Sequence, residues 1–320
     1  MIARLVLLCA ALAASSLAGA QVYPNGPVRL LIGYPPGGSA DFTARVLAED
    51  LARELGVAVV VENKPGAGTA IASDAVAKAA PDGQTLLLNW HQAIVRSLFK
   101  GQLSYDAERA FVPVSRVATG TTVLVAHDSV PAQSLGELIA LAKANPGKYN
   151  AASGGHGSAP HLALAAFEAA AGVKFTLIQY KGGGPATQSI LAGDTQVLFA
   201  TSPAVMGFIK AGRLKPLVVA MRKGSPAIPG IPGSEAAGLP AFESTFWFGV
   251  FAPAGTPATA VRRLHQAASA ALARPEVRAK IASQGMDATP SASPEAFAAE
   301  LAEEGPRLEQ LVRSLGARVE

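Results

Sequence analysis

The fold is decided by the stretch Val28-Arg29-Leu30-Leu31-Ile32 and by the turn Pro35-Pro36-Gly37-Gly38 that closely follows it. The five residues predict a buried strand, because short apolar runs bounded by turn residues are typical of strands. Ser39 predicts the cap of a helix, which continues at helical spacing to Leu55 and ends before Gly56. A strand, a glycine-rich loop and a helix in this order predict one unit of an α/β sheet.

The same unit recurs along the chain. Further strands are predicted at residues 57–61, 85–88, 149–152, 175–179, 196–200, 217–220 and 246–251. Helical patterns separate most of them, so we expect parallel sheets with helices on their faces. Strand-like segments at 112–114 and 122–126 flank Gly120, and the chain changes partners there. After residue 257 the pattern is almost entirely helical, which is too little sheet for a third lobe.

This order predicts an α/β protein of two lobes. The helical tail is expected to rejoin the first lobe, so that lobe 1 comprises residues 21–122 and 243–320 and lobe 2 comprises residues 123–242. The chain then crosses twice between the lobes, and two crossings form a hinge. A cleft between two such lobes is where a ligand is expected to bind.

The N-terminus predicts export. Residues 1–20 combine Arg4, an apolar run and a small-residue site before Gln21, the pattern of a cleaved signal peptide. The run is too short to span a bilayer, for which about 20 apolar residues are needed. Cys9 is the only cysteine and lies inside this segment, so the mature chain has no thiol for a disulfide, a metal site or a nucleophile.

Composition narrows the class further. Hydrophobic residues make up 50% of the chain and charged residues 16%, which is typical of a globular rather than a disordered protein. The formal charge of +4 becomes +3 when Arg4 is removed with the signal. Without a basic run, nucleic-acid binding is disfavoured. A mildly basic protein remains compatible with small anionic ligands.

Glycine-rich loops follow four predicted strands, at residues 35–41, 65–69, 153–158 and 181–185. In open α/β sheets ligands bind beyond the carboxyl ends of the strands. Glycine lets the backbone approach a ligand closely, and helix N-termini offer unpaired N–H groups to a carboxylate. Each loop taken alone could equally be a turn, but four at one edge favour an anion site.

Enzymatic motifs are incomplete. Gly66-Ala67-Gly68-Thr69-Ala70-Ile71 lacks the third glycine of a dinucleotide loop, and Lys181-Gly182-Gly183-Gly184 lacks the lysine of a phosphate loop. His156 and His161 are five residues apart, which disfavours a metal site on one helix. We expect His156 to face the cleft and His161 to pack or hydrogen-bond within a helix. No acid–base pair is evident, so we expect a binding protein without catalysis, metal or cofactor.

Six motifs stand in order along the chain: Tyr34-Pro35-Pro36-Gly37-Gly38-Ser39-Ala40-Asp41, Val61-Glu62-Asn63-Lys64-Pro65-Gly66-Ala67-Gly68, Pro81-Asp82-Gly83-Gln84-Thr85-Leu86, Ala142-Lys143-Ala144-Asn145-Pro146-Gly147-Lys148, Tyr180-Lys181-Gly182 and Phe251-Ala252-Pro253-Ala254-Gly255-Thr256-Pro257. Together they resemble the tripartite tricarboxylate transporter substrate-binding family, the Bug receptors. The resemblance implies a periplasmic protein of the Venus flytrap fold, with crossing hinge strands, and we expect the protein to be a monomer. It also implies a carboxylate ligand and delivery to a two-component membrane permease. A sensory subunit that presents its ligand to a membrane histidine kinase would need the same cleft and stays an alternative.

The predicted loops and the resemblance together imply the ligand-binding residues. They are Tyr34, Pro36, Gly37, Gly38, Asp41, Ala67, Trp90, His91, Gly155, His156, Gly157, Ser158, His161, Tyr180, Thr201, Ser202 and Phe248. The chain departs from its relatives at Ala200-Thr201-Ser202, where an aspartate is common, and this disfavours amino-acid ligands. Trp90-His91 also replaces small or polar residues. The pair either stacks on an aromatic ligand or packs beneath the loop.

Overall fold

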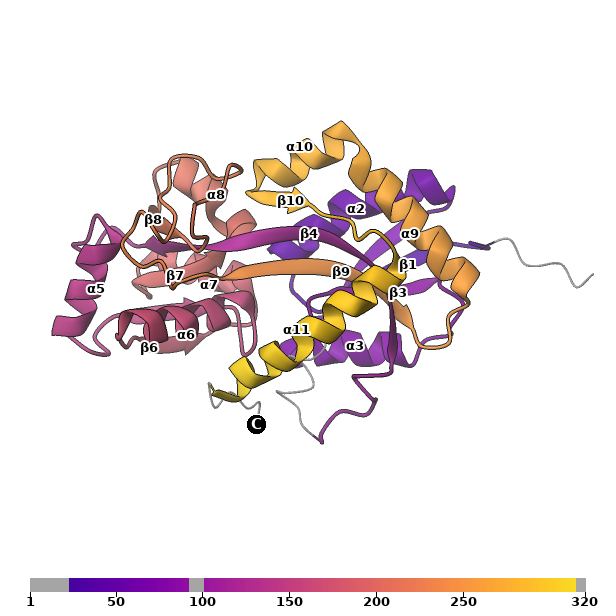
Figure 1. Ribbon diagram of the computed structural model, residues 1–320, viewed down its shortest axis with the longest axis horizontal. Helices are drawn as coiled ribbons and strands as arrows, with labels where there is room; N and C mark the ends of the chain where they lie inside the picture. The colour runs from indigo at the N-terminus through magenta and orange to yellow at the C-terminus, as the bar shows by residue number, and fades with distance from the viewer. Residues whose placement is uncertain (1–22, 92–100, 315–320) are drawn as a thin grey trace, which may run out of the picture.

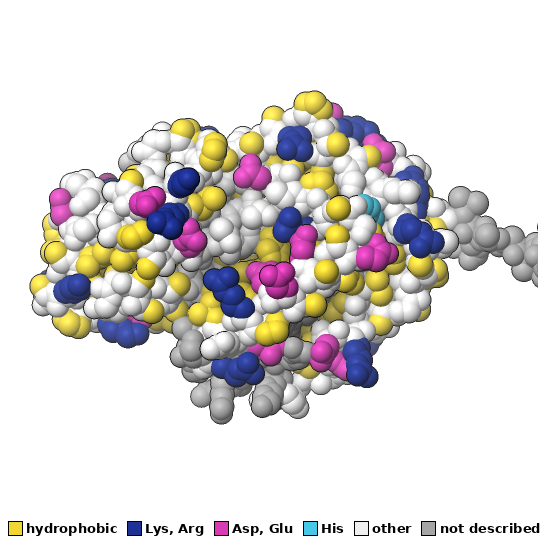
Figure 2. Space-filling model, in the orientation of Figure 1, with side chains coloured by type: hydrophobic (Ala, Val, Ile, Leu, Met, Phe, Trp, Pro, Cys, Tyr) yellow, Lys and Arg dark blue, Asp and Glu magenta, His cyan; other side chains and the backbone are white. Residues whose placement is uncertain are grey.

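The computed structural model describes residues 23–91 and 101–314, and it forms two α/β lobes side by side (Figure 1). The predicted signal peptide, with Cys9, lies outside the described residues. Within the described ranges no helix is both long and apolar enough to cross a membrane. Lysine and arginine side chains are interspersed with acidic ones on the face shown in Figure 2, without a field of one sign.

The first lobe is built on three parallel strands, with β1 between β2 and β3. The strands of its sheet are β1 (Val28–Ile32), β2 (Val59–Asn63), β3 (Thr85–Asn89), β9 (Thr245–Pro253), the first part of β4 (Phe111–Ala126) and β10 (Met286–Ala288). Its helices are α2 (Ser39–Leu55), the 3-10 turn η1 (Ala67–Thr69), α3 (Ala70–Ala77), α9 (Ala258–Ala273), α10 (Pro275–Ser283) and α11 (Pro294–Ser314). The helical tail therefore lies on the first lobe.

The second lobe repeats the pattern, with β5 between β6 and β7 in parallel. Its strands are β5 (Asn150–Ser153), β6 (Thr176–Gln179), β7 (Val197–Thr201), β8 (Lys215–Val219) and the last part of β4. Its helices are α5 (Leu135–Ala144), α6 (Ala159–Ala171), α7 (Gly183–Ala192) and α8 (Ser202–Lys210). Helix α8 and strand β10 were not predicted from the sequence.

The lobes are joined by β4 and β9, which run antiparallel to each other through the middle of the molecule (Figure 1). The residues of β4 up to Thr121 pair with β9, and those from Thr122 pair with β7 and β8. Two sequence expectations need correction here. The segments 112–114 and 122–126 are one strand, and the sheet is mixed because both crossing strands run antiparallel to their neighbours. The exact division of residues between the lobes stays a prediction.

The first unit forms as its sequence predicts, with one exception at the helix start. Leu30, Leu31 and Ile32 are fully buried, and α2 ends at Leu55 with Gly56 in the left-handed conformation. The helix begins at Ser39, however, so its N-cap is Gly38, which offers no side chain. The Ser39 hydroxyl is hydrogen-bonded to Thr201 of the other lobe instead.

Candidate ligand-binding site

Two adjoining cavities lie between the lobes, and we call them the chamber and the slot. The chamber has a volume of about 340 Å³ and is lined by Gly33, Tyr34, Pro35, Pro65, Gly66, Ala67, Gly68, Thr69, Asn89, Trp90, His91, Gly154, Gly155, His156, Gly157, Ser158, Gln179, Tyr180, Lys181 and Gly182. The slot has a volume of about 50 Å³ and is lined by Tyr34, Pro35, Gly38, Ser39, Ala40, Trp90, Gly154, Ser158, Ala159, Pro160, Gly183, Thr201, Phe246, Trp247 and Phe248. The chamber lies within the range of small-molecule sites, which begins at about 300 Å³.

The lining comes from loops at the carboxyl ends of the parallel strands in both lobes. The N-termini of α2, α6, α7 and α8, together with η1, lie among these loops. First-turn N–H groups have no partner within their own helix and carry positive partial charge. Lys181 is the only lysine, arginine, aspartate or glutamate among the described lining residues. An anion in this cleft would therefore meet mainly backbone N–H groups rather than charged side chains.

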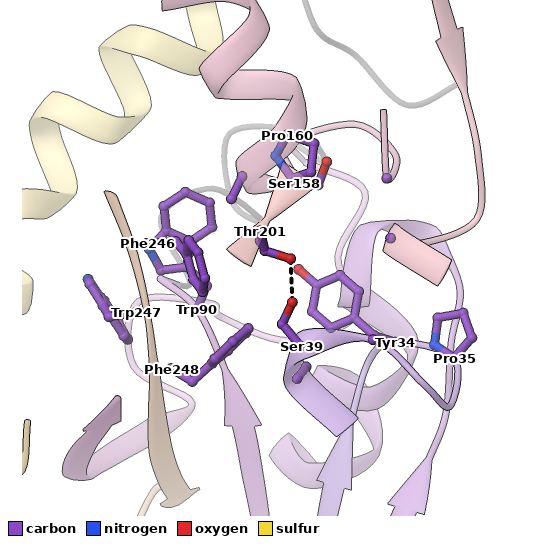
Figure 3. Close-up of a pocket in the computed structure, with 15 residues that line it drawn as sticks. Tyr34, Pro35, Ser39, Trp90, Ser158, Pro160, Thr201, Phe246, Trp247 and Phe248 are labelled. Carbon is purple, nitrogen blue, oxygen red and sulfur yellow. Dashed lines mark hydrogen bonds between the residues drawn. The ribbon is translucent and has the colours of Figure 1, made fainter. Parts of the chain in front are cut away.

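The two lobes touch across the cleft. The Ser39 and Thr201 hydroxyls form a hydrogen bond from one lobe to the other (Figure 3). Gly182 packs directly on Pro35, since a Cβ atom at Gly182 would lie 2.8 Å from Pro35 Cδ. Gly182 also has a φ of +120°, a backbone conformation that residues with a side chain rarely adopt. This contact between the lobes thus depends on a position that admits no side chain.

The loop after β1 is held by a carboxylate. The Gly37 N–H donates to Asp41 Oδ2 at 3.1 Å, and Asn63 Nδ2 donates both to Asp41 Oδ1 and to the Tyr34 carbonyl at 3.0 Å. Burial alone would raise the pKa of Asp41, but hydrogen bonds from Arg45, Gly37 and Asn63 together lower it below 3.8. Asp41 therefore stays charged and faces its own loop.

The loop after β5 is held by neutral groups. The Gly157 N–H donates to His161 Nδ1 at 3.1 Å, and Ser158 Oγ donates to the Gly155 carbonyl at 2.7 Å. Burial, assisted by the neighbouring His156, lowers the pKa of His161 from 6.5 to about 4. The imidazole is thus neutral and able to accept the hydrogen bond from Gly157.

The third loop, between β2 and α3, carries backbone strain. Ala67 and Thr69 have φ values of 44° and 79°, a left-handed conformation that is rare outside glycine. Thr69 is fixed there by Asn89, whose Nδ2 donates to Thr69 Oγ1 at 2.8 Å. The side-chain oxygen Oδ1 of Asn89 in turn accepts the Trp90 N–H at 2.9 Å. Strain of this kind, about 1–3 kcal/mol per residue, tends to occur at binding sites.

Several polar atoms of the chamber are buried without a partner. Among the described residues, no hydrogen bond reaches Trp90 Nε1, His156 Nδ1 or either amide atom of Gln179. An unsatisfied buried polar group costs about 1–3 kcal/mol, so such groups are rarely left unpaired without a reason. A ligand in the chamber would satisfy them.

The slot has aromatic walls. Phe246 and Phe248 project from the same face of β9 with ring centroids 5.5 Å apart, and they gather with Trp90 on one side of the slot (Figure 3). Tyr34 lies opposite, and burial raises the pKa of its hydroxyl to about 12, so it stays protonated. Trp247 points towards α11, where its Nε1 donates to Glu304 at 2.8 Å.

The structure brings together most of the residues predicted from the sequence. Twelve line the slot or the chamber: Tyr34, Gly38, Ala67, Trp90, His91, Gly155, His156, Gly157, Ser158, Tyr180, Thr201 and Phe248. Five do not line either cavity: Pro36, Gly37, Asp41, His161 and Ser202. For all seventeen, contact with a ligand stays a prediction.

The residues outside the two cavities have other contacts. Gly37, Asp41 and His161 hold the loops, as described above. Ser202 Oγ donates to the Gly285 carbonyl of the first lobe at 2.9 Å, away from the cleft. His91 does line the chamber, but its Nε2 lies 2.8 Å from the Leu301 carbonyl of α11.

Sequence reasoning missed three notable lining residues, Ser39, Gln179 and Phe246. Ser39 was assigned to a helix cap. Gln179 is the last residue of β6. The carboxyl ends of the other parallel strands were already predicted to lie at the ligand site. Phe246 is two residues from Phe248 in a strand, so the two share a face. The last two could have been found from the sequence pattern.

Comparison with known proteins agrees with this arrangement. A family model described as "Tripartite tricarboxylate transporter family receptor" matches residues 43–316. The chain belongs to this family. Protein BugT of Bordetella pertussis is 37% identical over 303 residues, covering 94% of this chain and 92% of BugT. The family's members are periplasmic binding proteins.

Solved structures show the same fold. An R. palustris protein with adipate superposes with a TM-score of 0.88 at 28% identity, covering 93% of this chain and 100% of that one. MatC from Rhodopseudomonas palustris with bound malate has a TM-score of 0.83 at 29% identity, covering 91% and 100%. This receptor thus has the two-lobed fold of periplasmic binding proteins, and the Bug-type family named from its motifs is confirmed.

Proposed function

We propose that this receptor captures a small carboxylate between its lobes and delivers it to a two-component membrane transporter of the tripartite tricarboxylate type. The observation that carries the proposal is the convergence of helix N-termini from both lobes on one cleft without an acidic lining residue. Backbone N–H groups and helix dipoles favour an anion there without an arginine. Relatives solved with adipate and malate support the same ligand class.

Capture would proceed by closure of the lobes. We propose that residues 21–122 with 243–320 move as one body and residues 123–242 as the other, with β4 and β9 bending between them. Two contacts then form only in the closed state. One is the hydrogen bond between the Ser39 and Thr201 hydroxyls, and the other is the packing of Pro35 on Gly182. A ligand that binds both lobes shifts the equilibrium towards this state.

The proposal includes no catalysis. Ser39 and Thr201, two hydroxyls of the slot, hydrogen-bond to each other rather than to a general base. The Ser158 hydroxyl donates to the Gly155 carbonyl and stabilises the loop. These groups bind and position, and a receptor of this family releases its ligand unchanged.

A thermal-shift series on the purified mature chain tests ligand capture. Carboxylates of different length and shape are compared with their uncharged amides at equal concentration. A ligand at 100 times its dissociation constant stabilises the folded protein by about 2.7 kcal/mol. Stabilisation by at least one carboxylate but not by its amide is expected. No stabilisation by any carboxylate would refute the function.

Export and delivery need experiments in cells. Mass spectrometry of the periplasmic fraction is expected to find a chain that begins at Gln21 without a lipid. A strain that lacks the gene is expected to lose uptake of the ligand and to regain it with the gene restored. Unchanged uptake combined with a lost transcriptional response would favour the sensory role.

A further inference from the structure

Helix α11 packs on the crossing strands and continues past them (Figure 1). Near its start, Phe297 lies 5.4 Å from Trp247 of β9 between ring centroids. Further along, Glu304 accepts a hydrogen bond from Trp247, which is paired with Thr119 of β4 close to the point where β4 changes partners. From Glu304 the helix runs on to Ser314, about 15 Å, in the direction of the second lobe.

The end of α11 meets α6 of the second lobe. A groove of about 580 Å³ lies there, and Leu311 lines it together with residues of α6 and of β6. Leu311 is the only described lining residue that comes from α11, and no residue of this groove lines the chamber or the slot. The two lobes therefore also approach each other at a place outside the cleft.

Helix α6 takes part in the cores of both lobes. Its residue Phe167 belongs to the buried apolar cluster of the second lobe. Ala159 and Leu162, by contrast, belong to the cluster formed mainly by the first lobe, which also contains Leu308 and Val312 of α11. One continuous apolar cluster thus includes the end of α11 and the start of α6.

The start of α6 also forms part of the cleft. Ser158 is the N-cap of the helix and lines both cavities. One turn later, His161 accepts the Gly157 N–H at 3.1 Å and lines the groove with Leu311. A movement of α6 relative to α11 would therefore also move the loop that precedes α6.

We infer that residues 307–314 of α11 form a clasp, which stabilises the closed arrangement of the lobes through Leu311. When the lobes open, α6 moves away from the first lobe, and the apolar surface that it shares with the clasp becomes exposed to water. Pro306 has no N–H to donate to the Ala302 carbonyl, so one helical hydrogen bond is missing where the clasp begins. The clasp can therefore adjust to α6. The inference rests on the proposed closure of the lobes but on no particular ligand.

The distance between the lobes, measured in the mature chain without added ligand, tests the inference. Cys9 lies in the predicted signal peptide, so spin labels can be attached to cysteines introduced at exposed positions, Ala58→Cys in the first lobe and Gln188→Cys in the second. Pulsed electron paramagnetic resonance then gives the ratio of closed to open protein. Leu311→Ala is expected to lower this ratio about fivefold, because a partly buried leucine loses its contact.

Leu301→Ala is the matched control. Leu301 precedes Pro306 on the same helix, is also partly buried against the core of the first lobe, and does not line the groove. This variant should leave the ratio unchanged. Ala165→Leu, on the groove side of α6, adds apolar contact with the clasp and should raise the ratio about threefold. Such a gain distinguishes the clasp from a general loss of stability.

Equal ratios in the parent and Leu311→Ala would refute the clasp, as would an equal loss in Leu301→Ala or a lower ratio in Ala165→Leu. A parent that is entirely open without ligand would also refute it. None of these results bears on carboxylate capture, which the thermal-shift series tests separately. A clasp supported by the distances, together with no stabilisation by any carboxylate, would refute the proposed function alone.

Discussion

The glycine-rich loops after β1 and β5 occupy the same place in their lobes, between a parallel strand and a helix N-terminus. Different side chains hold them. In the first lobe Asp41 accepts hydrogen bonds from Gly37 and Asn63 and is neutralised by Arg45. In the second lobe the neutral His161 accepts the corresponding bond from Gly157. The first loop is therefore held by a charge and the second by an uncharged imidazole.

This difference has a consequence for the carboxylate that we propose as the ligand. An aspartate near the cleft repels a carboxylate unless its charge is compensated, and here Arg45 lies within 2.9 Å of it. The imidazole of His161 carries no charge at neutral pH and needs no such partner. A charged and an uncharged side chain thus hold equivalent loops, and the two loops should respond differently to mutation, pH and salt.

The largest effect is expected where the loop after β1 meets the second lobe, at Gly182 in the loop between β6 and α7. Gly182→Ala places a methyl group against Pro35 and forces a strained backbone, so the lobes cannot close. We expect at least a 100-fold loss of affinity for the best carboxylate, with the circular dichroism spectrum unchanged. Calorimetry measures the affinity, and small-angle scattering should show no compaction on adding ligand.

Gly212→Ala is the matched control. Gly212 also has a positive φ, of +67°, but an added Cβ meets nothing within 4 Å. It carries the conformational cost alone and should bind like the parent. Parent-like affinity of Gly182→Ala would show that closure does not need this contact.

The second effect is a pH dependence of stability that belongs to His161. Its pKa is about 4 in the folded protein against 6.5 when unfolded, so the unfolded chain binds the extra proton between these values. The contribution is complete above pH 6.5 and is lost as the pH falls towards 4. Between pH 6.5 and pH 5 the loss amounts to roughly 2 kcal/mol.

Urea unfolding of the parent and of His161→Gln at several pH values measures this term. Glutamine can still accept the Gly157 N–H but does not titrate, so this part of the slope should disappear. His127→Gln, at the edge of lobe 2 away from the cavities, should retain it. Equal slopes in the parent and His161→Gln would assign the pH dependence to other groups.

A third, smaller effect concerns the first loop. Asp41→Ala removes the acceptor of the Gly37 N–H and frees the loop, so binding should weaken about tenfold because the loop must be ordered on binding. Since the pKa of Asp41 is already lowered below 3.8, this loss should be the same at pH 5 and pH 7. Asp128→Ala, at an exposed site, is the control. A loss that varies with pH would contradict the assignment.

The smallest effect is expected at Lys181, on the rim of the chamber. Its side chain is exposed, and exposed charges contribute little in water. Lys181→Ala should weaken binding about twofold at low salt and not measurably at high salt, where charges are screened. A loss greater than tenfold would mean that a side-chain charge, and not the backbone, binds the anion.

Much of the fold could be predicted from short sequence patterns. Residues 28–32 and the helix ending at Gly56 depend on short-range patterns, and both form as predicted. Gly120, by contrast, was interpreted as a break in the strand. Gly120 instead lies inside β4. The position needs glycine because a Cβ there would come within 2.6 Å of Phe246 Cζ. Only the folded structure reveals that a glycine makes room for a ring.

The site was predictable where it depends on strand ends and less so where it depends on contact between lobes. His156 and Ser158 follow β5 directly, and both line the chamber. Ser39 has the sequence of a helix cap, but its hydroxyl is hydrogen-bonded to a residue 162 positions away. Asp41, for which contact with a ligand stays a prediction, accepts a hydrogen bond from Gly37 of its own loop. Hydrogen bonds between residues so far apart in the chain cannot be predicted from the local sequence.

Strand β9 has one face towards the cleft and packs against helix α11 with the other. Phe246 and Phe248 line the slot, while Trp247 between them packs on Phe297 of α11 at 5.4 Å between centroids. The three share one extended backbone, so a shift of Phe246 on ligand binding would also act on Trp247. Helix α11 runs over the exterior from the first lobe towards the second (Figure 1). A membrane partner resting on α11 would sense whether the receptor is loaded without entering the cleft.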